Sequence, residues 1–193
     1  NCAASAPQAT RNAENKMLGK VHRAESAEPP ACNAATSSFR GRTAAQLSLA
    51  GEVDQAMPRC VVTRRVHFNA AHRLYNPRFS DAENERIFGV CNNPNFHGHN
   101  YNLDVSVEGD IDPATGYVLD INRLKEIVTE CLVRHLDHKN LNLDVPWFRE
   151  LIPTAENIAV VCWRVLEPAL KPTRLAHIRL WETERNYVDY TGT

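Results

Sequence analysis

The sequence predicts an α+β domain that contains an antiparallel sheet. Two segments, 99–108 and 174–182, alternate apolar and polar residues with a period of two, which is typical of half-buried strands. Two others, 122–135 and 154–168, carry apolar residues at the i, i+3, i+4, i+7 spacing of a helix with one buried face. Because strands and helices come in separate runs along the chain, we expect the strands to pair antiparallel.

The first strands surround two segments rich in turn-forming residues. Residues 60–68 have many β-branched side chains and predict the first strand, and 99–108 is the second. The run DPATG at 112–116 has the composition of a tight turn, so 117–119 is expected to return as a hairpin partner. Residues 76–95 carry prolines and a glycine among charged residues, which indicates a long loop.

Two helices are expected in the second half of the chain. The first runs from 122 to about 135, where the apolar stripe ends. The second begins with Thr154 as its N-cap and Glu156 in its positive first turn, and Pro168 is expected to end it.

The last two strands complete the predicted order β, β, β, α, α, β, β. Residues 174–182 alternate, which predicts Leu175 on the sheet face opposite to Ile178. Residues 187–190 can then pair back across a short turn.

Residues 1–58 differ in composition from the rest of the chain. Phe39 is their one aromatic residue, so the segment lacks the apolar surface needed to offset its chain entropy. We expect a disordered leader or non-native extension over 1–58 and a folded domain over 59–193. Met57 stands just before the first strand, and the natural protein is expected to begin there. An organelle transit peptide is the competing interpretation, because 29–51 has two arginines and no acidic residue.

The composition argues against two classes of partner. Lys plus Arg is 22 and Asp plus Glu is 23, and the resulting net charge of −1 offers no electrostatic footprint for nucleic acid or an anionic membrane. No window approaches the roughly 18 uninterrupted apolar residues of a membrane span. The six cysteines form neither C-x-x-C pairs nor a dense framework, which favours a reducing, cytoplasmic location.

The densest chemical signal is the run CNNPNFHGHN, which starts at Cys91. His97 and His99 lie two apart at the entrance to a strand, so both imidazoles can reach one ion. His72, after the first strand, can complete a three-histidine site with an open position, as in catalytic zinc sites. A lone histidine is more often solvent-exposed or hydrogen-bonded, and this is our interpretation of His22, His67, His135 and His177.

Three further residues have both a chemical and an ordinary interpretation. Beside a cation, Cys91 can act as a base or nucleophile, but it can also be a fourth ligand or simply buried. Asp137 can orient His138 for acid–base work, although the pair also suits a charge cluster at a helix C-terminus. Glu182 can accept two N–H donors from a ring edge, or be a plain strand-end carboxylate.

These motifs resemble, in order and spacing, the 6-pyruvoyltetrahydropterin synthase family. The resemblance covers essentially all of 59–193. It implies a tunnelling fold (T-fold), an antiparallel four-stranded sheet with two helices on one face, whose trimers close a β-barrel and pair into hexamers with active sites at subunit interfaces. The other matching motifs are HRLY at 72–75, DPATG at 112–116, LDHKNL at 136–141, PTAEN at 153–157 and ET at 182–183.

The resemblance also implies a zinc-dependent phosphorus–oxygen lyase. The reaction would convert 7,8-dihydroneopterin triphosphate to 6-pyruvoyl-5,6,7,8-tetrahydropterin with loss of triphosphate, in tetrahydrobiopterin-type biosynthesis. One Zn²⁺ per subunit is implied, with Mg²⁺ or basic residues such as Arg73 and Lys139 beside the triphosphate. The resemblance implies that His72, His97 and His99 hold the zinc and that Cys91 accepts a proton. It implies that Asp137 and His138 form the proton relay, and that the pterin contacts are Glu182, Thr154 and Glu156.

One departure from the family and two rival functions remain open at this point. Phe96 stands where the family usually carries a small residue, commonly Gly, and it would be strained if the backbone there needs positive φ. The sister 6-carboxytetrahydropterin synthase of the queuosine pathway typically has its cysteine three residues before the first histidine, whereas five residues separate Cys91 from His97. A noncatalytic zinc- or pterin-binding subunit would need neither Cys91 nor the Asp137–His138 pair.

Overall fold

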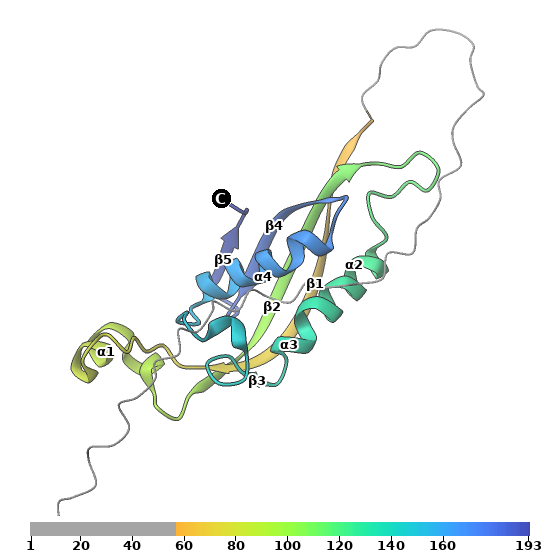
Figure 1. Cartoon of the computed structure of the whole chain (residues 1–193). Helices are drawn as coiled ribbons and strands as arrows, with labels where there is room; N and C mark the ends of the chain where they lie inside the picture. Colours follow the sequence, from red (N-terminus) through yellow and green to blue (C-terminus); the bar gives the residue numbers. More distant parts are fainter. Residues whose placement is uncertain (1–56) are drawn as a thin grey trace, which may run out of the picture.

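The computed structural model describes residues 57–193, which form a five-stranded sheet with helices packed against it (Figure 1). The strands lie in the order β3-β1-β2-β4-β5. β1, β2, β4 and β5 pair antiparallel as predicted, and the short β3 adds a parallel pairing at the edge of β1. The strand bounds are Arg59–His72 (β1), His97–Asp110 (β2), Lys139–Asn140 (β3), Arg174–Trp181 (β4) and Tyr187–Tyr190 (β5). The predicted leader over 1–58 lies almost entirely outside the described residues.

The longer helices cover one face of this sheet, while α1 projects beyond its end (Figure 1). α2 packs against β1, and α4 packs against β4 and β5. α2 continues through a π-helical turn into α3, so the predicted helix over 122–135 is one slightly longer helical unit. The helix bounds are Asp81–Phe88 (α1), Ile121–Val128 (α2), Thr129–Val133 (π), Arg134–Leu136 (α3) and Ala155–Ala169 (α4), with 3₁₀ turns at Gly89–Asn92 and Pro146–Phe148.

The core lies between the sheet and these helices. The inward side chains of β2 are fully buried against the predicted apolar stripes of both helices. Each such side chain contributes roughly 1.5–3 kcal/mol of transfer free energy, which holds the histidine-bearing end of β2 in a rigid frame. The members on β2 are Tyr101, Leu103, Val105 and Val107.

The predicted alternation along β4 is wrong at its start. Ser106 pairs with His177, but the next residue, Val107, pairs with Leu175, so a β-bulge interrupts the register. An extra residue in one strand reverses the faces of the residues beyond it. Leu175 and Ile178 are therefore both buried in the core, although the sequence pattern placed them on opposite faces.

The predicted hairpin strand at 117–119 does not form. The carbonyl of Tyr117 accepts the Asp112 N–H at 2.9 Å, which closes the predicted turn, but the chain then enters α2. β2 is already paired with β1 on one side and with β4 on the other, so no free edge of β2 is left for a third partner.

The predicted loop over 76–95 contains a helix, α1. Ser80 and Glu83 form a reciprocal capping box, in which Ser80 Oγ accepts the Glu83 N–H and the Glu83 carboxylate accepts the Ser80 N–H. This S-x-x-E pattern is a sequence signal for a helix start that composition alone obscured. At the other end of the chain, α4 ends at Ala169, one residue beyond Pro168, with Thr154 as its N-cap as predicted.

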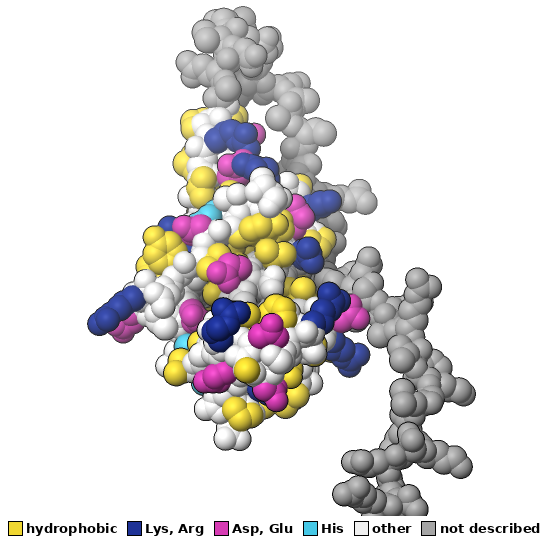
Figure 2. Space-filling view, turned by 90° about the vertical axis from the view of Figure 1, so that its left-hand side faces the viewer, with side chains coloured by type: hydrophobic (Ala, Val, Ile, Leu, Met, Phe, Trp, Pro, Cys, Tyr) yellow, Lys and Arg dark blue, Asp and Glu magenta, His cyan; other side chains and the backbone are white. Residues whose placement is uncertain are grey.

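The surface carries charges of both signs. Figure 2 shows acidic and basic side chains interspersed over the face that it presents, in keeping with the balanced composition. Within residues 57–193, no helix combines the length and the apolar character that crossing a bilayer requires.

Candidate active site

The three predicted ligand histidines converge at one end of the β1–β2 ladder. His72 is paired directly with His97, and Ala70 faces His99, so all three imidazoles share the sheet face of Tyr101. The small side chain of Ala70 leaves room beside the His99 ring. The nitrogens able to bind an ion all lie within 4.8 Å of one another, and Nε2 of His72 is 3.0 Å from Nε2 of His97.

Two groups that sequence reasoning missed orient His72. Nδ1 of His72 lies 2.7 Å from the carbonyl oxygen of Pro153 and 3.4 Å from the hydroxyl of Tyr101. A carbonyl can only accept, so Nδ1 carries the proton and the Nε2 lone pair points at the other imidazoles. Pro153 belongs to the PTAEN motif, but its contribution is a backbone atom, which residue type does not reveal.

Burial favours the neutral form of two of these imidazoles, those of His72 and His97. His72 is 1% exposed, and its desolvation lowers its pKa to about 4, although the Pro153 carbonyl acts in the opposite direction. Burial also lowers the pKa of His97, with a further contribution from His99. A neutral imidazole is the form that binds a metal ion.

The donor set fits Zn²⁺. With Zn–N bonds of about 2.0–2.1 Å, two nitrogens at the tetrahedral angle lie roughly 3.3 Å apart. The Nε2 atoms of His72 and His97 are already close to that separation at 3.0 Å. The buried Nδ1 of His97 has no hydrogen-bond partner among the described residues. Three nitrogen donors suit zinc better than Mg²⁺ or Ca²⁺, which prefer oxygen.

Glu182 lies at the same cluster. It follows the last residue of β4, and its Oε1 is 3.8 Å from Nε2 of both His72 and His99. The N–H of Glu182 donates to the Asn186 carbonyl, so the β4–β5 turn fixes its backbone. The side chain is only 24% exposed, and its carboxylate can accept donors from a ring placed over the histidines.

Cys91 occupies a 3₁₀ turn, Gly89–Asn92, that precedes β2. Its side chain is partly buried, and its carbonyl accepts the Leu74 N–H at 2.9 Å. Burial, and secondarily the Glu182 carboxylate, raise the pKa of the Cys91 thiol. The surrounding protein alone therefore favours the neutral thiol, and a cation at the histidines would favour the thiolate.

The Asp137–His138 pair lies at the end of α3, beside β1. Asp137 Oδ1 accepts the Asn69 N–H at 2.8 Å and Oδ2 is 3.0 Å from His138 Nδ1. The Asn69 N–H, followed by His138, lowers the pKa of the Asp137 carboxyl. His138 has a φ of 58° and an exposed ring, and its N–H donates to the Asn69 carbonyl. The pair thus lies at a helix C-terminus, and in the same place the Asp137 carboxylate orients the His138 ring.

Thr154 and Glu156 have separate environments. Thr154 Oγ1 accepts the Asn157 N–H at 3.3 Å as the α4 cap, and the residue follows Pro153 at the histidine cluster. Glu156 is exposed in the first turn of α4. The structure therefore places Thr154 nearer to the histidines along the chain, while Glu156 faces solvent.

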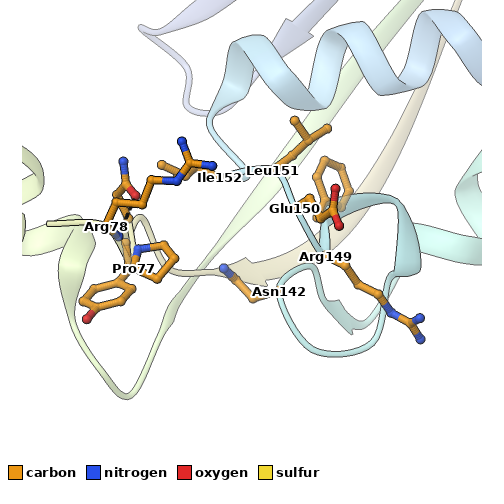
Figure 3. Close-up of a pocket in the computed structure, with 10 residues that line it drawn as sticks. Pro77, Arg78, Asn142, Arg149, Glu150, Leu151 and Ile152 are labelled. Atoms are coloured by element: carbon orange, nitrogen blue, oxygen red, sulfur yellow. Dashed lines mark hydrogen bonds between the residues drawn. The ribbon is translucent and has the colours of Figure 1, made fainter. Parts of the chain in front are cut away.

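Two hollows adjoin these residues. One, of about 360 Å³, is lined by Lys139, His138 and His99 together with asparagines of β1, β2 and β3. The other, of about 680 Å³, lies between the chain that follows β1 and the chain that precedes α4. Figure 3 shows Arg78 and Arg149 at its two sides, with the Arg149 guanidinium pointing away from the space between them. The larger hollow thus lacks converging cations.

Phe96 adopts a φ of 63°, the left-handed region in which a side chain is strained. Its N–H donates to the Asn93 carbonyl at 3.0 Å, which keeps the turn between Cys91 and His97 closed. The position therefore does favour glycine, as the departure from the family pattern suggested. The ligand histidines still converge in its presence.

Comparison with known proteins identifies the chain's relatives. The 6-pyruvoyl tetrahydropterin synthase family profile matches residues 61–193. The human 6-pyruvoyl tetrahydrobiopterin synthase is 48% identical over 131 residues, which are 68% of this chain and 90% of the human protein. The Drosophila melanogaster 6-pyruvoyl tetrahydrobiopterin synthase is 45% identical over 136 residues, covering 70% of this chain and 81% of the fly protein. The solved Caenorhabditis elegans 6-pyruvoyl tetrahydropterin synthase has a TM-score of 0.66 and 37% identity, covering 71% of this chain and 98% of the other.

The fold and the relatives define the protein as an α+β enzyme of the T-fold class. The chain belongs to the 6-pyruvoyl tetrahydropterin synthase family. The resemblance inferred from the sequence motifs is confirmed, as are the fold class and the enzymatic nature of the protein. The roles of the individual site residues remain predictions.

Proposed function

We propose that this enzyme converts 7,8-dihydroneopterin triphosphate to 6-pyruvoyl-5,6,7,8-tetrahydropterin with elimination of triphosphate. The observation that carries the proposal is the convergence of three imidazoles on the sheet face that also presents Glu182. The names of the human and Drosophila relatives support the same product.

His72, His97 and His99 would hold one Zn²⁺ per subunit. A zinc ion so held supplies Lewis acidity, which makes the carbon-bound protons next to a coordinated substrate oxygen easier to remove. The chain's contribution is to favour the neutral forms of His72 and His97 by burial and to fix His72 through the Pro153 carbonyl.

Cys91, Glu182 and the Asp137–His138 pair would move the protons and hold the ring. Glu182 accepts N–H donors from the pterin edge and so places the side chain of the substrate beside the histidines. Cys91 takes a proton from that side chain once it is in the thiolate form. Asp137 keeps Nδ1 of His138 protonated, which leaves Nε2 of His138 free to exchange protons with the substrate.

The triphosphate would leave through the hollow that contains Lys139 and His138, with Mg²⁺ bound to the leaving group. Lys139 and His138 line this hollow together with three asparagines. Arg73 was the other candidate, but its guanidinium is already engaged with Asn92. Lys139 is therefore the better candidate of the two.

A homohexamer built as a dimer of trimers is part of the proposal. Within residues 57–193, β3 pairs with β1 only at Ala70 and Ala71, no other strand of this part of the chain pairs with that β1 edge, and β5 forms the opposite edge of the sheet. Unpaired edges are suited to joining strands of neighbouring copies, and such joining removes an exposed edge. Because His138 is largely exposed in the single chain, it could serve a neighbouring subunit. A catalytic thiol also favours a reducing, cytoplasmic location.

The test is to identify the product by mass spectrometry after the purified protein is given 7,8-dihydroneopterin triphosphate. We expect a pyruvoyl pterin and free triphosphate, stoichiometric zinc, and a loss of at least about 100-fold in turnover in Cys91→Ala. Cys60→Ala is the matched control, because Cys60 is an exposed cysteine at the far end of β1. A carboxy pterin with acetaldehyde would favour the sister synthase, and binding without turnover would favour a noncatalytic subunit.

A further inference from the structure

Arg73 directly follows the ligand His72, and its guanidinium binds the residue after Cys91. Nε of Arg73 donates to the backbone carbonyl of Asn92 at 2.8 Å, and Nη2 donates to its side-chain Oδ1 at 2.9 Å. Asn92 is 7% exposed and Arg73 is half-buried, so the acceptor side of these bonds is largely shielded from water. The planar fork of arginine suits two acceptors on one residue, whereas a lysine ammonium does not reproduce that geometry.

The neighbouring residues strengthen the connection between the two segments. The Leu74 N–H donates to the Cys91 carbonyl at 2.9 Å, so adjacent residues after β1 hold adjacent residues before β2. The Tyr75 ring lies 4.4 Å from the Arg73 guanidinium carbon, which restricts the guanidinium on its other side.

A third segment fixes the backbone of Arg73. Asn142 Oδ1 accepts the Arg73 N–H at 2.8 Å and its Nδ2 donates to the Arg73 carbonyl at 3.0 Å. Asn142 lies four residues after His138, and Figure 3 shows it between the Pro77–Arg78 chain and the Arg149–Glu150 chain. One arginine thus joins the segments that carry His72, Cys91 and His138.

We propose that Arg73 is a positioning residue that holds the Cys91 turn at its place relative to the histidine cluster. The effect of Arg73 on catalysis rests on the proposed function, whereas its effect on the position of the Cys91 turn does not depend on that function. Without the fork, the turn opens, the thiol becomes more accessible, and turnover falls because the thiol is no longer held beside the bound substrate. Substrate binding through Glu182 changes little.

The experiment compares Arg73→Gln, Arg73→Lys and Asn92→Ala with Arg78→Gln in the full chain. Arg78 is the matched control because it is an exposed arginine on the same connecting segment. Iodoacetamide labelling of Cys91, resolved by peptide mass spectrometry, reports its accessibility, and hydrogen exchange of the Leu74 amide reports its bond to the Cys91 carbonyl. Circular dichroism and melting temperature establish that each variant is folded.

For Arg73→Gln we expect Cys91 labelling and Leu74 exchange to increase by about tenfold or more, because loss of a single charge-assisted hydrogen bond gives about tenfold and the substitution removes both bonds of the fork. We expect kcat to fall by about tenfold or more with KM within about threefold. Arg73→Lys should recover little of this loss, Asn92→Ala should show a smaller effect, and Arg78→Gln should match the wild type.

Unchanged labelling and exchange in a folded Arg73→Gln protein would overturn the positioning role. If Arg73→Gln does not fold, unchanged values in a folded Arg73→Lys protein have the same meaning, because a lysine ammonium does not reproduce the fork. Increased labelling in a protein whose wild type makes no pyruvoyl pterin would support the positioning role and reject the proposed function, so the two failures are distinguishable.

Discussion

The buried imidazole of His72 predicts a specific loss of stability in mild acid. In the folded, metal-free protein its pKa is lowered to about 4, whereas in an unfolded chain it is about 6.5. Between these values the unfolded chain binds more protons than the folded one. The free energy of unfolding therefore falls as the pH falls from about 6.5 to about 4, and the contribution is fully present above that window.

The size of the effect follows from the shift. One pKa unit corresponds to 1.36 kcal/mol, so His72 alone accounts for about 3 kcal/mol across the window. This is a large part of the roughly 5–15 kcal/mol by which domains are stable. His97, whose pKa is also lowered by burial, acts in the same direction.

The assay is urea unfolding with EDTA at several pH values from 7 to 4.5, at constant protein concentration. Carboxyl groups also titrate near the lower end of this range, so the slope of wild type is compared with that of variants that keep every carboxylate. The slope of the unfolding free energy against pH reports how many more protons the unfolded chain binds than the folded one. His72→Asn should lower that number by up to one. His135→Asn is the matched control, since His135 is an exposed imidazole away from the cluster, and it should retain the wild-type slope.

An equal slope in wild type and His72→Asn would refute the reasoning, because it would mean that His72 takes up its proton in the folded state as readily as in the unfolded state. A reduced slope in His135→Asn would show that the measurement responds to imidazoles in general rather than to burial at the site.

Three further results are expected. His97→Ala should lose more than the roughly 10–100-fold in zinc affinity that removal of a hydrogen-bond partner of a ligand costs, because it removes a ligand itself. Metal content after dialysis measures this loss, and zinc should no longer raise the melting temperature of the variant. Asp104→Asn should lose at most about 1 kcal/mol at pH 7, because the carboxylate accepts two bonds from the exposed Arg65 guanidinium, which is the main cause of its lowered pKa. That difference from wild type should shrink only as the pH falls below about 3.8 and through the folded pKa, and a constant difference would contradict the ion-pair explanation. Phe96→Gly should be more stable than Phe96→Ala by about 1 kcal/mol in chemical denaturation, since only glycine adopts a φ of 63° without strain, and the reverse order would contradict the strain.

Local patterns in the sequence were sufficient for the main elements of the fold. The period of two over 99–108 and the helical stripes from 122 and 154 correspond to β2, α2 and α4. These predictions succeed because a half-buried strand or helix must repeat its apolar residues at its own geometric period. The capping box at Ser80 was equally readable, and the prolines and charges around it obscured it.

Predictions failed where the outcome depended on pairing between distant segments. Residues 117–119 have a strand-like setting, but both edges of β2 are taken by β1 and β4. Leu175 changes face because a bulge shifts its register against Val107. Neither the availability of an edge nor the position of a bulge is encoded in the periodicity of one strand.

The candidate site divides in the same way. The sequence by itself determined which side chains could bind a metal or carry protons, because imidazole, thiol and carboxylate chemistry is a property of the residue type. Only the tertiary structure decided that His72 faces His97, that the Pro153 carbonyl selects its tautomer, and that Arg73 serves the Cys91 turn. The reason is that distance, burial and backbone contacts arise between segments far apart in the chain, and these quantities set the pKa, the tautomer and the reach of each group.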